Sequence, residues 1–169
     1  MLAPGVNPIA FSNDGRLFAA VTYRGDVLFQ LDPFFRHKPR VIVRDAGWLN
    51  GMDWGSDGFL YAPIWSKGQV VRIDVNSGKT AVVAEGFGEP AAVKFDSKAR
   101  LHLVDYQTGK VWQISIQTGE KRVLVQLPPH LDNLAFDSKD HLFVSHAEEG
   151  YIYEILPEPS AVRGKAATR

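Results

Sequence analysis

Cysteine is absent from the 169 residues, so the chain can form neither disulfide bonds nor thiolate metal sites. An excess of one charge is missing as well, because 19 lysine and arginine residues balance 19 aspartate and glutamate residues. Nucleic acids require a basic face, and this balance therefore argues against nucleic acid as a partner. The absence of cysteine agrees with a cytoplasmic protein, which is the location that we expect.

Long apolar runs are also missing. No stretch approaches the roughly 20 apolar residues that a membrane-spanning helix needs, so we expect no membrane partner. The first residues, 1–8, have neither the basic nor the apolar region of a signal peptide. Apolar residues nowhere recur at i, i+3, i+4 and i+7 over three turns, and helices therefore have little support.

What the sequence does contain is an internal repeat of about 41 residues. The tetrapeptide Phe-Asp-Ser-Lys stands at residues 95–98 and again at residues 136–139. Four anchor aromatics follow one another with steps of 43, 41 and 41 residues: Phe11, Trp54, Phe95 and Phe136. Four glycines have the same steps: Gly25, Gly68, Gly109 and Gly150. Two independent anchors with equal steps establish a repeat.

Each copy of the repeat contains short apolar segments between turn residues. The segments are five to eight residues long and rich in Val, Ile and aromatic residues, which favours strands over helices. Asp57-Gly58 and Asp14-Gly15 are hairpin signals, because glycine adopts positive φ without steric cost. Four short antiparallel strands in about 40 residues, repeated in tandem, predict the blades of a β-propeller. A plain sandwich gives no reason for turns that recur at a constant period.

The predicted fold is therefore all-β, a propeller of about four tandem four-stranded blades at residues 5–46, 47–86, 87–127 and 128–156. The last blade has only three strand-like segments, and residues 157–169 are predicted to be a flexible C-terminal tail. An open row of blades leaves an apolar face bare at each end. We therefore expect a partial ring that completes itself as a homo-oligomer or belongs to a longer propeller, with a tight four-bladed closure as the alternative.

Residues 49–54 (LNGMDW), followed by residues 57–61 (DGFLY), resemble the senescence marker protein/gluconolactonase family. Strictosidine synthase-like and NHL-repeat propellers are wider relatives of that family. Its members are six-bladed, so the resemblance implies that this chain is a partial-length propeller. It also implies an activity, the metal-assisted hydrolysis of a lactone or a related ester.

The same resemblance implies a set of metal ligands. In that family, ligands of an axial divalent cation stand four residues before the anchor hydrophobe of an inner strand. The equivalent positions here hold Asn7, Asn50, Ala91 and Asp132. Asn7, Asn50 and Asp132 would bind the cation, Ca²⁺ first and Zn²⁺ or Mg²⁺ as alternatives, and Asp132 would also be the general base. Ca²⁺ prefers several amide and carboxylate oxygens, and a bound cation polarises a carbonyl group. Ala91 departs from the pattern, and no residue matches the family's glutamate ligand from the first blade.

Three further sets of residues are candidates for function. His130, Asp132 and His146 suit zinc, although surface histidines are the preferred interpretation. Trp48 and Trp65, on either side of Asn50, could form the apolar wall of a small-ligand site, and packing between blades is the preferred alternative. Asp105, at the end of a strand, is predicted to be an acceptor that stabilises a turn.

Two functions therefore stand side by side. One is a gluconolactonase-like hydrolase that uses a divalent cation. The other is a non-catalytic propeller that binds a small ligand or a protein partner after losing part of the metal site, and Ala91 and the missing glutamate favour it.

Overall fold

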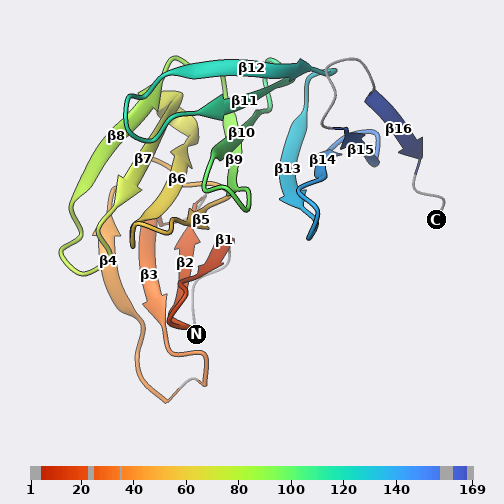
Figure 1. The fold of residues 1–169 in the computed structure, drawn as a ribbon. Coiled ribbons are helices and arrows are strands. Elements are labelled where there is room, and N and C mark those ends of the chain that lie inside the picture. The colour runs from red at the N-terminus through yellow and green to blue at the C-terminus, as the bar shows by residue number, and fades with distance from the viewer. Residues whose placement is uncertain (1–4, 23–24, 35, 157–161, 167–169) are drawn as a thin grey trace.

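The computed structural model describes residues 5–22, 25–34, 36–156 and 162–166. It contains four antiparallel sheets, each made of four strands that are consecutive in the chain, which confirms the predicted all-β propeller architecture (Figure 1). The strands are β1 (Val6–Phe11), β2 (Leu17–Val21), β3 (Val27–Leu31), β4 (Arg40–Arg44), β5 (Asp53–Trp54), β6 (Leu60–Ile64), β7 (Gln69–Ile73), β8 (Thr80–Glu85), β9 (Pro90–Phe95), β10 (Leu101–Asp105), β11 (Lys110–Ile114), β12 (Lys121–Gln126), β13 (Leu131–Phe136), β14 (Leu142–His146), β15 (Tyr151–Ile155) and β16 (Val162–Ala166). In the described part of the chain, the helical element is the three-residue 3₁₀ turn η1 (Trp65–Lys67), and no helix is long enough to cross a membrane.

The fourth sheet is complete, which corrects the expectation of an unfinished last blade. β16 pairs with β15 in antiparallel register from Ile155–Val162 to Tyr151–Ala166. Its sequence, VRGKA, has a single β-branched residue and so gave little strand signal, whereas the pairing itself uses backbone groups. The rest of the predicted tail, residues 157–161 and 167–169, lies outside the described residues.

Consecutive sheets pack face to face through a hydrophobic cluster at each junction. The described residues form three such clusters, and none contains residues from both the first and the fourth sheet. Examples of buried members are Phe18 and Leu60 at the first junction, Tyr61 and Leu103 at the second, and Val104 and Leu134 at the third. The first strands of neighbouring sheets contact one another in chain order, β1 with β5, β5 with β9 and β9 with β13. Figure 1 shows the resulting open arc, with β13–β16 set apart from β1–β4.

The anchor aromatics of the repeat form one contact that recurs at every junction. Each anchor packs against an aromatic ring on the second strand of the preceding sheet, with ring centroids 5.5 Å apart for Trp54 and Phe18, 5.1 Å for Phe95 and Tyr61, and 4.9 Å for Phe136 and His102. The partners Phe18, Tyr61 and His102 stand at the same steps of 43 and 41 residues as the anchors. No sheet precedes that of Phe11 among the described residues, and the Phe11 side chain is 56% exposed.

Candidate functional site

The segments that open the first strands of neighbouring sheets converge at one end of the arc. Gly51 forms a parallel bridge with Ala92, in which the Gly51 N–H donates to Ala91 O at 2.9 Å and the Val93 N–H donates to Gly51 O at 2.8 Å. A Cβ atom on Gly51 would lie 2.4 Å from the Ala92 Cβ atom, so only glycine permits this approach. The sequence immediately around Asn50 is therefore pressed against the next sheet.

Asn7 and Asn50, two of the three predicted ligands, are in direct contact. Asn7 Nδ2 donates a hydrogen bond to Asn50 Oδ1 at 3.1 Å, and the same oxygen accepts from the Gly51 N–H at 3.0 Å. Thr22 links the two segments, because its hydroxyl lies within hydrogen-bond distance of two carbonyl oxygens, Leu49 O at 2.7 Å and Asn7 O. Asn50 is buried, whereas Asn7 is exposed. The propeller thus brings together two side chains that are 43 residues apart in the sequence.

Asp132, the third predicted ligand, lies at the start of β13 with an exposed side chain. Among the described residues, no hydrogen bond or ion pair joins its carboxylate to another side chain, Asn7 and Asn50 included. The negative charge of Asp132 affects the pKa of Tyr106. That pKa is raised by partial burial and by the negative charges of Glu148, Glu89 and Asp132. The Tyr106 phenol therefore stays protonated at neutral pH.

The donor set for a cation rests on asparagine. No three His, Asp or Glu side chains in the described segments are clustered so as to hold a metal ion. A cation at the inner strand ends would therefore depend on amide oxygens, which Ca²⁺ accepts. Turning over the Asn7 amide would bring its oxygen beside Asn50 Oδ1, and two facing carbonyl oxygens repel each other unless a cation lies between them. The side-chain oxygens of Asn7 and Asn50 are thus the amide donors at this end of the arc, and Ala91 supplies no side-chain oxygen to the set.

A row of aromatic and imidazole rings crosses the second, third and fourth sheets. Ring centroids are 5.3 Å apart for Trp65 and Tyr106, 4.9 Å for Tyr106 and His130, and 6.1 Å for His130 and His146. His130 Nδ1 also lies 2.8 Å from Glu148 Oε2. Sequence reasoning did not select Tyr106, although a step of 41 residues from Trp65 leads directly to it.

The remaining residues that the sequence suggested for function differ in burial and in their contacts. His146 is only 4% exposed and its Nδ1 accepts from the Glu149 N–H at 3.2 Å, so the interpretation as a surface histidine is wrong for this residue. Trp65 packs against the cluster of the third junction, whereas Trp48 is 46% exposed. Asp105 is confirmed as a turn acceptor, because its buried carboxylate receives the N–H groups of Gly88, Glu89 and Thr108 at 2.8, 3.1 and 3.2 Å.

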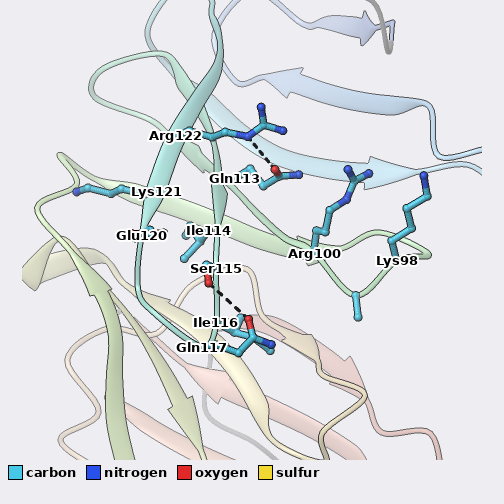
Figure 2. A pocket seen from close by; sticks show the side chains of 11 residues that line it. Lys98, Arg100, Gln113, Ile114, Ser115, Ile116, Gln117, Glu120, Lys121 and Arg122 are labelled. Atoms are coloured by element: carbon cyan, nitrogen blue, oxygen red, sulfur yellow. Dashed lines mark hydrogen bonds between the residues drawn. The ribbon is translucent and has the colours of Figure 1, made fainter.

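A cavity of about 740 Å³ lies apart from all of these residues, on the third sheet (Figure 2). It is lined by the β9–β10 turn and by the β11–β12 hairpin. Arg122 Nε donates to Gln113 Oε1 at 2.9 Å, and Arg100 Nε donates to the buried Asp96 carboxylate at 2.6 Å. The cavity contains none of the predicted metal ligands, and its arginines serve to fix the hairpins.

Solved structures share this fold at low sequence identity. A gluconolactonase from Xanthomonas campestris superposes with a TM-score of 0.81 at 12% identity, over 97% of this chain and 62% of its own. A catalytically inactive virginiamycin B lyase from Staphylococcus aureus, crystallised with quinupristin, gives 0.78 at 15% identity, over 100% of this chain and 58% of its own. A chain of a nidogen/laminin complex gives 0.78 at 16% identity, over 89% of this chain and 59% of its own.

The chain thus belongs to the β-propeller class, with the fold seen in gluconolactonase and virginiamycin B lyase. It spans about three fifths of the length of these structures. No protein-family model and no curated protein matches its sequence.

Proposed function

We propose that the end of the propeller at which the first strands begin binds a divalent cation and hydrolyses a lactone or a related ester. The observation that carries the proposal is the contact between Asn7 and Asn50, at two positions that the repeat makes equivalent. The fold shared with a gluconolactonase supports it. Amide oxygens of Asn7 and Asn50 and the carboxylate of Asp132 would hold the cation, Ca²⁺ in preference to Zn²⁺ or Mg²⁺.

Each residue has a role that follows from its surroundings. Asn50 is held in place by the Gly51 N–H and by burial, so it is the fixed member of the pair. Asp132 is exposed and free to accept a proton from water, as a general base must. The protonated Tyr106 phenol can donate a hydrogen bond to the oxygen on which negative charge develops. The cation, when bound, would polarise the carbonyl of the substrate and lower the pKa of a bound water.

Calorimetric titration with CaCl₂ tests the site, and release of acid from a simple lactone tests the activity. We expect saturable calcium binding that Asn50→Ala and Asp132→Ala each weaken at least tenfold. Asp137→Ala, an exposed aspartate on a turn of the same sheet, is the control and should bind as the unsubstituted chain does. Absence of heat with calcium, magnesium and zinc alike would remove the proposal.

A second function is favoured by a different observation. Ala91 interrupts the ligand positions, and the Asn7 and Asn50 amides satisfy each other without a cation. These features suit a propeller that binds a small ligand or a protein without catalysis, and a chain of this fold occurs in the nidogen/laminin complex. In that case, the calcium titration gives no heat and the lactone stays intact, while the chain remains folded by circular dichroism.

A further inference from the structure

The cavity on the third sheet, about 740 Å³ in volume, is lined by more positive than negative charge (Figure 2). Its lining contains four basic residues, Lys98, Arg100, Lys121 and Arg122, and one acidic residue, Glu120. Sites for small molecules usually have volumes of roughly 300–1,000 Å³, so the cavity is large enough for such a ligand. The excess of positive charge favours a ligand that is negatively charged.

The fold does not require basic residues at these positions. The second sheet has the same two turns one period of 41 residues earlier, and the positions equivalent to Lys98, Arg100 and Arg122 hold no basic residue there: Asp57, Phe59 and Ala81. Since a sheet of this kind forms without them, the three basic side chains of the third sheet can serve a purpose other than building it.

The two arginines are positioned through their Nε atoms, which leaves the ends of the guanidinium groups for a ligand. Arg100 Nε donates to Asp96 Oδ2 at 2.6 Å, and Arg122 Nε donates to Gln113 Oε1 at 2.9 Å. Within the described segments, neither arginine donates a hydrogen bond through an Nη atom. Figure 2 shows Lys98, Arg100 and Arg122 extending to the same side of the third sheet. Each guanidinium group is therefore preorganised to donate to an anion.

Both guanidinium groups lie close to the buried ring of His102. Burial lowers the pKa of this imidazole, and the positive charges of Arg100 and Arg122 lower it further, although Asp96 opposes the change. Two positive charges that approach the same ring repel each other, and an anion between them would relieve the repulsion.

One basic residue of the lining is already used within the chain. Lys121 Nζ donates to Gly86 O at 3.0 Å. The carboxylate of Asp140, beside the cavity, is also occupied, because it accepts from the Ser97 N–H at 3.0 Å. Lys98 and the two arginines therefore carry the positive charge that remains for a ligand.

Apolar surface lies beside these charges. Ile114 and Ile116 belong to the lining, together with the amide side chains of Gln113 and Gln117. An inorganic anion would leave this surface uncovered, whereas an organic group attached to the anion would cover it and remove it from water. The cavity therefore suits an anion that carries an organic group.

We propose that the cavity binds a phosphate monoester. The phosphate group lies among Lys98, Arg100 and Arg122, and the organic group lies against Ile116. A guanidinium group matches two phosphate oxygens at once, and the ammonium group of lysine binds phosphate as a point charge. This proposal does not depend on the proposed function, because the cavity contains none of the proposed cation ligands.

Calorimetric titration of the chain with phenyl phosphate, in the absence of divalent cations, tests the proposal. We expect saturable one-to-one binding that weakens as NaCl is added, because salt screens exposed charges. Inorganic phosphate should bind more weakly, since it lacks the organic group, and phenol should not bind. Arg122→Gln and Lys98→Gln should each weaken the binding of phenyl phosphate about tenfold. Both residues are exposed, so we expect the variants to stay folded.

Arg44→Gln is the matched control, because it removes the same charge from an exposed arginine at the end of β4, outside the cavity. It should bind phenyl phosphate as the unsubstituted chain does. If Arg122→Gln is misfolded by circular dichroism, Arg122→Lys replaces it and should also weaken binding, since it keeps the charge but loses the contact with two oxygens.

Three results would overturn the proposal. One is the absence of heat with phenyl phosphate. Another is binding that neither Lys98→Gln nor the Arg122 variant weakens, since the phosphate then lies elsewhere. The third is equal weakening by Arg44→Gln, because binding would then follow the net charge of the chain and not the cavity.

Discussion

The side-chain amide nitrogen of Asn7 lies 3.1 Å from the Oδ1 oxygen of Asn50, although the two residues are 43 positions apart and belong to different sheets. Their positions are equivalent in the repeat, each four residues before an anchor aromatic. The contact therefore comes from the arrangement of the sheets around a common centre.

Replacing Asn50 with alanine should destabilise the chain even without a cation. The substitution leaves the Asn7 amide without its acceptor and removes a bond to the Gly51 N–H, so the free energy of unfolding should fall by about 1–2 kcal/mol. Urea denaturation measures the change. Asn76→Ala, at an exposed turn, is the control and should change it by less than about 0.5 kcal/mol. An unchanged midpoint for Asn50→Ala would show that the Asn7–Asn50 pair does not contribute to stability.

Gly51→Ala adds a single methyl group but should clearly lower the free energy of unfolding. The new Cβ atom would lie 2.4 Å from the Ala92 Cβ atom and 3.1 Å from Ala91 O, so the two sheets must move apart. We expect a loss of about 1–3 kcal/mol in the free energy of unfolding. Adding Ala92→Gly removes the closest atom and should recover part of the loss, which makes the two changes non-additive. If the double variant is no more stable than Gly51→Ala, the close approach is not the cause.

Lowering the pH should destabilise the cluster formed by Asp96, Arg100 and His102. Burial opposes ionisation of Asp96, but hydrogen bonds from the Arg100 N–H, from Arg100 Nε and from His102 outweigh it, and the pKa of Asp96 is lowered from 3.8. Burial, aided by the charges of Arg100 and Arg122 and opposed by Asp96, lowers the pKa of His102 from 6.5. The unfolded chain therefore binds more protons than the folded chain at acid pH.

Stability should accordingly decrease as the pH falls below 6.5, first through His102, and again below 3.8 through Asp96. Thermal unfolding between neutral and acid pH measures this. Asp96→Asn should reduce the loss of stability below pH 3.8 and cost about 1–3 kcal/mol at neutral pH. Asp45→Asn, at an exposed aspartate that has no side-chain hydrogen bond among the described residues, serves as the control. If Asp96→Asn lost stability below pH 3.8 as steeply as the unsubstituted chain does, Asp96 would not be a source of that loss.

Tyr106→Phe tests whether the row of rings formed by Trp65, Tyr106, His130 and His146 takes part in the proposed hydrolysis. If the phenol donates to the developing negative charge, its loss should lower kcat by about 10²-fold with little change in KM, as for other lost donors of this kind. Steady-state kinetics with a lactone substrate measure both constants. Tyr151→Phe, at an exposed tyrosine of β15, should behave as the unsubstituted chain. A change confined to KM would make Tyr106 a binding residue only.

The period of the sequence predicted the sheets and the equivalent positions, because both depend on spacing. It therefore placed Asn7 and Asn50 at corresponding strand starts, and the structure brings them together. Contacts between sheets were harder to predict, since they depend on how side chains at equivalent positions differ in length and polarity. His146 is buried and Asp132 is exposed although both belong to the fourth sheet. Tyr106 was missed because its partners, Trp65 and His130, come from the sheets on either side.

The recurring ring-on-ring contact also determines how the single chain should lose its structure. In the described part of the chain, the main contacts between sheets join sheets that are consecutive in the sequence. Four sheets in an open row should therefore behave as a one-dimensional array, in which stability is a sum of terms for each sheet and each junction. The sheets of β1–β4 and β13–β16 are each held by one junction, whereas β5–β8 and β9–β12 are held by two. Amide protons should consequently exchange with solvent from both ends of the row inward, and β6 and β10 should be the last to give up theirs.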